Sequence, residues 1–315
     1  MKTLTEKEVE ARLDPGRLIG AIEEAFRSRY PYALIPLRTQ MRLADGVFLI
    51  MPCYDRPRRA LGMKLIMVLD NPSAPELKIQ AMYLLLDANT GEPMAGMSAA
   101  HLTDLRTAAA SAVATKYLAR EDVRVLGIFG TGRQARSHLR LLQLARNFER
   151  FLVSGIDPGQ SREFAQEMAR ELRAPVESVY SRTCAAESDV LCTCTTSTTP
   201  LFDGHLLRPG THLNCIGAFR PNTREVDSVT VLRSRVVVDT YEGAFAEAGD
   251  LLIPMSEGVI TRTHILADLH ELLIGMKVVR RDREEITMFK SVGVALEDLA
   301  AAELVVAEAN QNSAR

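Results

Sequence analysis

A short apolar run that leads directly into two closely spaced glycines constrains the fold of this chain more than any other feature. Residues 123–129 (VRVLGIF) have the composition of a buried strand, and residues 130–135 (GTGRQA) follow with the spacing Gly-x-Gly-x-x-Ala. Residues 134–146 then show the pattern of an amphipathic helix. A strand, a glycine turn and a helix in this order predict the first unit of a dinucleotide-binding sheet.

The glycine loop has the residue types that a pyrophosphate requires. Gly130 permits a tight turn, Gly132 lets the backbone approach the phosphates, and Ala135 is small enough for the helix to pack on the strand. The N-terminus of the helix adds hydrogen-bond donors and a partial positive charge. We therefore predict that NAD(H) or NADP(H) binds here, and a glycine turn without a ligand is the alternative. The predicted phosphate-binding residues are Gly130, Thr131, Gly132, Arg133, Gln134 and Ala135.

The end of the second predicted strand leaves the choice between NAD and NADP open. NAD enzymes usually place an acidic residue there, where it binds the ribose hydroxyls. In this chain Gly155 occupies that place, and Asp157 follows two residues later. No arginine follows immediately, although Arg133, Arg162 or Arg182 could reach a 2′-phosphate. We include Asp157 in the predicted cofactor site.

The pattern of apolar residues changes along the chain and indicates two segments. The first contains an amphipathic helix at residues 14–30 and ends in a long helix at 98–119, with Ser98 as its candidate N-cap. Between these helices, four apolar or alternating runs predict a mostly antiparallel sheet. These runs are residues 35–44, 46–54, 60–70 and 76–87. From residue 123 onward strands alternate with helices, which predicts a parallel sheet covered on both faces. The expected fold class is α/β, with a boundary near residues 118–122.

Charge and hydropathy exclude several classes of protein. The formal net charge of −2 gives no general attraction for nucleic acid or for an anionic membrane. The sequence has no run of about 18 uncharged apolar residues that could span a bilayer. Its charged N-terminal stretch lacks the apolar core of a signal peptide. We expect a soluble, cytoplasmic protein that binds neither nucleic acid nor membrane.

The cysteines favour a reduced protein without a metal site. There are 5 of them, an odd number scattered along the chain, which is not typical of a disulfide framework. Cys192 and Cys194 form a CxC pair that could be half of a metal site, but no second ligand pair stands at a matching spacing. We therefore interpret them as buried structural cysteines.

Three basic residues precede the glycine loop in unusual surroundings. Lys64 lies in a predicted strand that is otherwise almost entirely apolar, where an unpaired charge is costly. Arg106 lies in the middle of a helix, and Arg38 follows Pro36 in the first predicted strand. Two guanidinium groups and one ammonium would suit a substrate that bears a carboxylate. The alternative is that Lys64 extends to a sheet edge and that the arginines are ordinary surface residues.

Several sequence blocks resemble the ornithine cyclodeaminase/mu-crystallin family nearly from end to end. The most specific ones are the RTAA-S-A-A-T-K pattern within residues 102–118, EAGDL at 247–251 and FKSVG-A-EDLA within 289–302. The other matching blocks are PLR (36–38), GMK (62–64), GTGRQA (130–135), TTSTTPLFDG (195–204), PGTHLNCIGAFRPNTREVD (209–227) and VVVDT (236–240).

The resemblance implies a homodimer and a domain arrangement. Residues 1–118, completed by 293–315, would form an α+β substrate-binding and dimerisation domain with a mostly antiparallel sheet. A Rossmann dinucleotide-binding domain, residues 119–292, would be inserted in it. The resemblance also implies that Arg38, Lys64 and Arg106 bind the carboxylate and the nitrogen of the substrate. It places six further residues near the nicotinamide, namely Thr195, Thr196, Ser197, Ser291, Val292 and Gly293.

Members of this family differ in chemistry, and two substitutions distinguish this chain from the cyclodeaminases. Where they carry an aspartate in the loop matching residues 217–221, this chain has Phe219. Where they carry a glutamate before the Met-Pro pair, this chain reads FLI at 48–50. Cyclodeamination needs such an acid/base group, so the resemblance favours an NAD(P)H-dependent reductase of a small cyclic ketimine carboxylate, with Lys64 as the catalytic residue.

The substrate would be Δ1-pyrroline-2-carboxylate or Δ1-piperideine-2-carboxylate. The alternatives are an ornithine cyclodeaminase, an open-chain amino-acid dehydrogenase of the alanine type, and a dinucleotide-dependent small-ligand binding protein.

Overall fold

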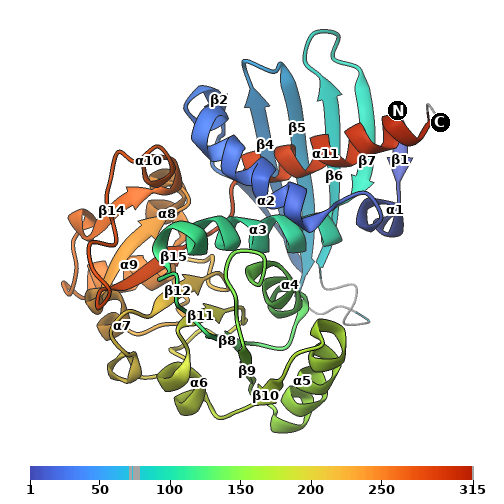
Figure 1. The fold of residues 1–315 in the computed structure, drawn as a ribbon. Helices are drawn as coiled ribbons and strands as arrows, with labels where there is room; N and C mark the ends of the chain where they lie inside the picture. Colours follow the sequence, from blue (N-terminus) through green and yellow to red (C-terminus); the bar gives the residue numbers. More distant parts are fainter. Residues whose placement is uncertain (71–72, 74–78, 314–315) are drawn as a thin grey trace. The chain divides into compact units, whose positions relative to one another are not determined.

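The computed structural model describes residues 1–70, 73 and 79–313. The chain divides into two compact units, Met1–Arg106 with Val294–Arg315, and Thr107–Gly293 (Figure 1). The division falls inside helix α3 (Ala100–Leu118), whereas the pattern of the sequence predicted it near residues 118–122. The rest of α3 belongs to the second unit because its polar side chains bond there: Ser111 Oγ lies 2.9 Å from His138 Nε2, and Thr115 Oγ1 accepts a 2.9 Å bond from Asn214 Nδ2.

The first unit contains a mixed sheet with the strand order β1-β7-β6-β5-β4-β2, and β3 pairs with β4 outside this path. All neighbouring strands are antiparallel except β1 and β7, so the predicted mostly antiparallel sheet is confirmed. The strands are β1 (Lys2–Leu4), β2 (Ala33–Leu34), β3 (Thr39–Leu43), β4 (Gly46–Asp55), β5 (Ala60–Leu69), β6 (Ile79–Asp87) and β7 (Pro93–Ser98).

Three details of the expected elements are corrected. Ser98 is the last residue of β7, so it is not the N-cap of α3, which begins at Ala100. Arg38 lies in the loop before β3 and not within a strand. β1 and β7 were not predicted, because β1 has only 3 residues and β7 directly follows a turn. The break expected at residues 71–72 and the start of the strand expected from residue 76 lie outside the described residues.

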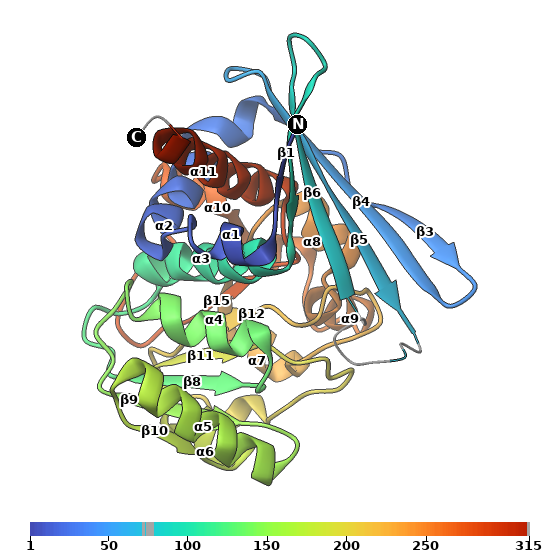
Figure 2. The ribbon, with the colours of Figure 1, turned by 90° about the vertical axis from the view of Figure 1, so that its right-hand side faces the viewer.

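Helices cover one face of this sheet (Figure 2). Helix α11 (Ala295–Ser313) packs on β4, β5 and β6 and against α2 (Pro15–Glu24). α2 begins where its sequence predicts, because the Asp14 side chain caps it and Pro15 takes its first position. The preceding α1 (Glu6–Glu10) begins with a capping box between Thr5 and Glu8. After α2 the chain continues through η1 (Ala25–Arg29) and η2 (Tyr30–Tyr32).

The strand register separates two faces of different character. Lys64 pairs with Met51 of β4 and with Tyr83 of β6, and all three are buried on the helix-covered face. The next row, Leu65 with Ile50 and Met82, points to the opposite face because side chains alternate along a strand. That face carries apolar residues that are only partly buried or exposed. Its rows are Ile50, Leu65 and Met82; Pro52, Met63 and Leu84; and Tyr54, Leu61 and Leu86.

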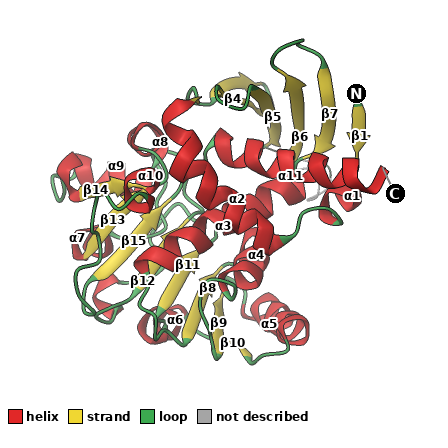
Figure 3. Ribbon diagram, turned by 45° about the horizontal axis from the view of Figure 1, so that its top comes forward, coloured by secondary structure: helices red, strands yellow, loops and turns green. Residues whose placement is uncertain are grey.

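The second unit is a Rossmann-like, entirely parallel sheet with the strand order β10-β9-β8-β11-β12-β15-β13-β14 (Figure 3). The predicted α/β class is therefore confirmed. The order reverses at β8, because β9 and β10 lie on one side of it and β11 and β12 on the other. Its strands are β8 (Val125–Phe129), β9 (Arg150–Ser154), β10 (Val176–Ser178), β11 (Val190–Thr193), β12 (His212–Cys215), β13 (Ser234–Val238), β14 (Ile265–Asp268) and β15 (Ile286–Lys290).

The helices of this unit follow the strands in sequence and flank the sheet. Buried residues such as Leu191, Leu213 and Met288 form its core. No helix in the described part of the chain is long and apolar enough to cross a membrane. The helical segments are α4 (Arg133–Leu142), α5 (Pro158–Leu172), α6 (Ser181–Glu187), η4 (Gly204–Leu206), α7 (Ser228–Arg233), α8 (Tyr241–Glu247), α9 (Gly249–Ser256), η5 (Arg262–His264) and α10 (Leu269–Leu273).

Candidate active site

The glycine loop joins β8 to α4 and exposes its backbone. Gly130 has a φ of +109°, which favours glycine, and a Cβ there would stand 2.6 Å from the carbonyl oxygen of Cys194. Gly132 is the N-cap of α4 and makes no side-chain cap hydrogen bond. A Cβ at Gly132 would meet nothing within 4 Å, so the space beside the helix N-terminus is open. Ala135 is fully buried beneath it. These features fit the pyrophosphate of a dinucleotide.

Side chains pack closely around Gly155 at the end of β9. A Cβ at Gly155 would stand 2.6 Å from Ser161 Oγ and 3.1 Å from Thr131 Cγ2, so a side chain at this position would require these two side chains to shift. Asp157 caps α5, because its Oδ1 accepts a 2.6 Å hydrogen bond from the backbone N–H of Gln160. The structure therefore gives Asp157 a local role, and its contact with a ribose stays a prediction.

Two further loops leave the same edge of the parallel sheet as the glycine loop. After β11, the backbone N–H and the hydroxyl of Thr195 each donate a 2.7 Å hydrogen bond to Glu225 Oε1. Ser197 follows, with its N–H 3.1 Å from Thr195 Oγ1, and Thr196 between them is exposed. The carboxyl ends of parallel strands are where such sheets bind ligands, so the predicted Thr195–Ser197 segment is suitably placed within this unit.

The loop after β15 is held by a residue that the sequence reading missed. Asp239, directly after β13, accepts hydrogen bonds from Ser291 Oγ (2.9 Å), Val292 N (2.7 Å) and Gly293 N (2.8 Å) on one carboxylate oxygen. Gly293 has a φ of +85°. The predicted turn Ser291–Gly293 is thus fixed by Asp239. The aspartate that ends the VVVDT block was the available signal.

In the first unit, two buried cations meet two buried carboxylates. Lys64 Nζ lies 2.8 Å from Asp298 Oδ1, and Arg106 Nε lies 2.9 Å from the same oxygen. Arg106 Nη1 also lies 2.5 Å from Glu297 Oε2. We call Lys64, Arg106, Glu297 and Asp298 the buried charge cluster. The carboxylates engage Nε and Nη1 of Arg106, which fixes the plane of the guanidinium and leaves Nη2 outside these two ion pairs.

Burial and the charges around Lys64 shift the pKa of its ammonium group. The pKa of Lys64 is lowered from its usual 10.5 to about 8, because burial and, after it, the positive charge of Arg106 lower this pKa more than Asp298 raises it. Arg38 also lowers this pKa, so its charge acts on the same ammonium. The structure thus brings the three predicted cations, Arg38, Lys64 and Arg106, together in one unit. A lysine with a pKa near neutrality can both hold and release a proton.

Unsatisfied polar atoms mark the same place. Asp298 Oδ2 and the Tyr83 hydroxyl are buried, and neither has a hydrogen-bond partner within the described residues. Tyr83 stands directly opposite Lys64 in the sheet register, and burial followed by the charge of Asp298 raises the pKa of its hydroxyl. Buried polar atoms are rarely left unpaired in proteins. Beside Lys64 there are thus two polar atoms whose hydrogen-bonding capacity the described residues do not use.

Asp298 and Glu297 were not predicted as site residues. Their signal was the EDLA block near the end of the sequence, which carries two adjacent acids in an otherwise apolar helix. Sequence spacing alone could not connect them with Lys64, since 234 positions separate Asp298 from that lysine.

The histidines and cysteines behave as structural residues. His138 is buried, contacts Ser111 Oγ and the carbonyl of Gln134, and has its pKa lowered to about 4 by burial. His264 contacts the carbonyl of Val231 at 2.8 Å. Cys192 is fully buried in β11, and burial raises the pKa of its thiol. All five cysteines are free thiols, and the described residues contain no cluster of metal-ligand type.

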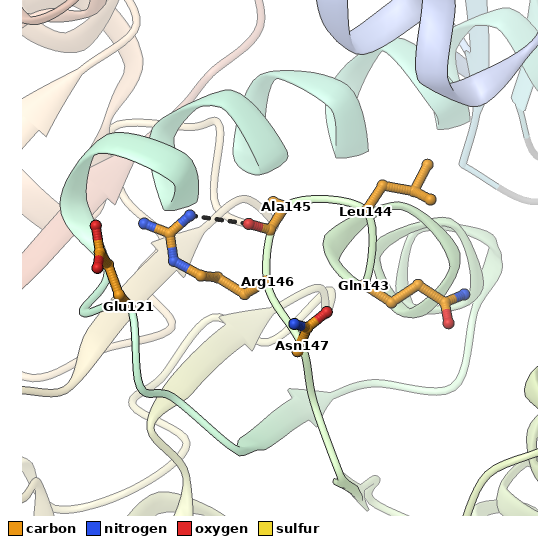
Figure 4. Close-up of a pocket in the computed structure, with 6 residues that line it drawn as sticks. All are labelled: Glu121, Gln143, Leu144, Ala145, Arg146 and Asn147. Atoms are coloured by element: carbon orange, nitrogen blue, oxygen red, sulfur yellow. Dashed lines mark hydrogen bonds between the residues drawn. The ribbon is translucent and has the colours of Figure 1, made fainter.

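A polar pocket of about 290 Å³ lies at the opposite end of α4 from the glycine loop (Figure 4). The Arg146 guanidinium beside it donates to the backbone carbonyls of Lys116, Ala119, Arg120 and Ala145. These bonds give Arg146 a structural role, and none of the predicted site residues lines this pocket. The lining residues are Glu121, Gln143, Leu144, Ala145, Arg146 and Asn147.

The fold and the two sets of residues define a class of protein, a dinucleotide-binding α/β protein with a separate unit that carries buried cations. The model of the ornithine cyclodeaminase/mu-crystallin family matches residues 1–313, and the chain belongs to this family. The resemblance predicted from the sequence blocks is therefore confirmed.

Similar proteins carry several names within this family. A Δ1-pyrroline-2-carboxylate reductase of Bacillus cereus is 36% identical over 282 residues, which are 88% of this chain and 86% of that protein. The ketimine reductase mu-crystallin of Macropus fuliginosus is 34% identical over 274 residues, 86% of this chain and 83% of that protein. The solved Δ1-pyrroline-2-carboxylate reductase of Thermococcus litoralis, in complex with NADH and L-proline, is 39% identical with a TM-score of 0.94, covering 99% of this chain and 98% of that one.

Proposed function

We propose that this protein is an NAD(P)H-dependent reductase that converts a small cyclic ketimine carboxylate, Δ1-pyrroline-2-carboxylate or Δ1-piperideine-2-carboxylate, to the cyclic amino acid. The observation that carries the proposal is the buried Lys64, held 2.8 Å from Asp298 and facing the charges of Arg106 and Arg38. Two arginines and one lysine match a ligand with a carboxylate and an adjacent nitrogen. The similarity to a reductase solved with NADH and L-proline supports the same chemistry and NAD(H) as the cofactor.

Each residue of the site has a role in this reaction. Arg38 and Arg106 bind the substrate carboxylate, and Lys64 contacts the imine nitrogen. A reduced dinucleotide held by the glycine loop would supply the hydride for the imine carbon. The electron pair of the C=N bond then moves to the nitrogen, which takes a proton from the Lys64 ammonium, and Lys64 regains its proton from water. Asp298 holds Nζ in place through this cycle, since its Oδ1 lies 2.8 Å away.

The chain lacks the groups that would favour cyclodeamination. Phe219 is exposed in the loop after β12, and Phe48, Leu49 and Ile50 precede the Met-Pro pair in β4. None of these side chains can accept or donate a proton. Imine reduction needs a single proton at the nitrogen and no second acid/base group, so it is the reaction that the present residues support.

We further propose that the protein is a homodimer and acts in the cytoplasm. The open face of the mixed sheet consists of apolar rows through Leu61, Met63 and Leu65, which a second copy would remove from water. A similar structure, 30% identical with a TM-score of 0.92, is an archaeal alanine dehydrogenase dimer with bound NAD. The five free thiols fit a reducing compartment.

The test is cofactor oxidation in the presence of each candidate substrate. We expect NADH or NADPH consumption with at least one of the two cyclic imines and slower consumption with pyruvate plus ammonia. Turnover only with the open-chain oxo acid and amine would favour an amino-acid dehydrogenase, and proline and ammonia from ornithine would favour a cyclodeaminase. No turnover with either cyclic imine would refute the proposal.

A further inference from the structure

We propose that three buried residues of the second unit, Glu225, Asp250 and Lys290, position the nicotinamide half of the cofactor by fixing the loops after β11 and β12. We call them the loop-anchoring cluster. The inference rests on the proposed dinucleotide-dependent function and adds residues to it. It also gives a role to Asp250 and Lys290 of the EAGDL and FKSVG blocks, which the catalytic roles above leave unexplained.

Glu225 is fully buried and acts as a hydrogen-bond acceptor for both loops. Burial and the nearby charge of Asp250 raise its pKa, while its donors favour the ionised form. All but one of these donors lie in loops and not in strands. The donors are Thr193 Oγ1 (2.7 Å), Thr195 N (2.7 Å), Thr195 Oγ1 (2.7 Å), Gly217 N (2.7 Å) and Ala218 N (3.3 Å).

Asp250 and Lys290 complete the cluster from two other elements. Asp250, in the first turn of α9, accepts hydrogen bonds from the backbone N–H groups of Glu225 (2.7 Å) and Val226 (3.1 Å). Lys290, the last residue of β15, lies 2.8 Å from Asp250 Oδ2 and donates a 2.6 Å bond to the carbonyl of Ala218. Although burial alone would lower the pKa of Lys290, Asp250 raises it, so the ion pair is maintained. The cluster therefore holds the loop after β12 from both sides.

The two loops approach each other closely at Gly217. A Cβ at Gly217 would stand 2.2 Å from the carbonyl oxygen of Thr195 and 2.5 Å from Glu225 Oε1. Both atoms are too close for a side chain at residue 217, so the backbone of the loop after β12 packs directly on the loop after β11. A change at Glu225 would consequently move both loops together.

The strand order assigns these loops to one end of the cofactor. A dinucleotide crosses the sheet where the strand order reverses, with its phosphates at the first glycine loop and one half on each side. Here the reversal lies at β8, and the Gly155–Asp157 segment after β9 lies on the side of the adenosine ribose. The loops after β11 and β12 lie on the other side, where the nicotinamide half belongs. The cluster therefore acts on one half of the ligand only.

This one-sided action gives a test by binding alone. ADP-ribose contains the adenosine and both phosphates of NADH but lacks the nicotinamide. In Glu225→Gln, an amide that cannot accept all of these hydrogen bonds replaces the carboxylate, so we expect NADH to bind about tenfold more weakly, measured by fluorescence titration. Calorimetry should show ADP-ribose binding unchanged within about twofold. Equal weakening of both ligands, or no weakening of NADH, would overturn the inference.

Two further variants keep the test decisive. Thr193→Val removes one of the donors to Glu225 without changing the size of a buried side chain, so it serves if Glu225→Gln does not fold. It should weaken NADH severalfold and leave ADP-ribose unchanged, and no change in NADH affinity would count against the cluster. Glu177→Gln is the control, because Glu177 is an exposed carboxylate of β10 that pairs with Arg150. A wild-type protein that binds ADP-ribose but no NADH or NADPH would instead contradict the proposed function.

Discussion

Lys64 Nζ and Asp298 Oδ1 lie 2.8 Å apart, and neither side chain is exposed to solvent. A charge in such a place is costly unless it is paired and hydrogen-bonded. Asp298 Oδ1 serves both Lys64 and Arg106, while Asp298 Oδ2 has no partner in the described part of the chain. If the buried charge cluster served only to stabilise the fold, we would expect each of its buried oxygens to have a hydrogen-bond partner. The arrangement is better explained by a ligand that completes it.

Asp298→Asn should shift the pH dependence of imine reduction. Asp298 raises the pKa of Lys64, whereas burial, Arg106 and Arg38 lower it, so removing the carboxylate lowers this pKa below about 8. Lys64 donates its proton only when charged, and activity is lost as the pH rises through its pKa. The alkaline limb of the kcat profile should therefore move to lower pH.

The control for this shift lies on the same helix. Glu303 pairs with Arg29 and not with Lys64, so Glu303→Gln should leave the alkaline limb in place. The charge of Asp298 also acts on two neighbouring titratable groups, Tyr83 and Cys53. An Asp298→Asn enzyme that is slower but has an unshifted limb would contradict the role of Asp298 in tuning Lys64.

Gly132→Asp should weaken NADH binding without lowering the stability of the fold. The open space at this position accommodates a side chain, and aspartate is a favourable N-cap, so the melting temperature should stay the same or rise. The new carboxylate would stand where the phosphates bind, and we expect NADH affinity to fall by more than about tenfold. Gly132→Ser provides the same cap without the charge and should cost less affinity. Unchanged NADH binding in Gly132→Asp would place the phosphates elsewhere.

Leu65→Glu should convert the proposed dimer to a monomer. Leu65 lies in the apolar row with Ile50 and Met82 on the uncovered face of the sheet, where a charge is tolerated in water but not in an interface. Light scattering after size exclusion would give the mass of each variant. Glu149→Lys, an exposed change in the second unit, should leave the mass unchanged. A monomeric wild-type protein, or a Leu65→Glu variant that is still a dimer, would show that this face is not the dimer interface.

The dinucleotide unit could be predicted because its signals are local. The apolar strand, Gly130 and Gly132 follow one another closely in the sequence. In the structure Gly130 has a positive φ, and the space beside Gly132 is open. Lys64 could be singled out because a charge interrupts an apolar strand. β1 is an example of an element that could not be predicted, since its 3 residues carry no periodic pattern and its partner strand β7 is remote in sequence.

The partners of the predicted cations could not be found from spacing. Asp298 reaches Lys64 only because α11 returns to the first unit after the whole second unit has been traversed. Glu225, Asp250 and Lys290 are likewise distant from one another, and each alone reads as a surface charge. Buried ion clusters depend on tertiary packing, so a structure is needed to reveal them.

Reduction of Δ1-pyrroline-2-carboxylate by the wild type and by Lys64→Met tests the central claim most directly. Methionine keeps most of the lysine stem but has no proton to give. We expect the wild type to oxidise NADH with this imine or with its six-membered homologue. We expect kcat of Lys64→Met to fall by at least about a hundredfold while its affinity for NADH is retained. Comparable kcat values in the two proteins, with intact NADH binding in both, would contradict the account.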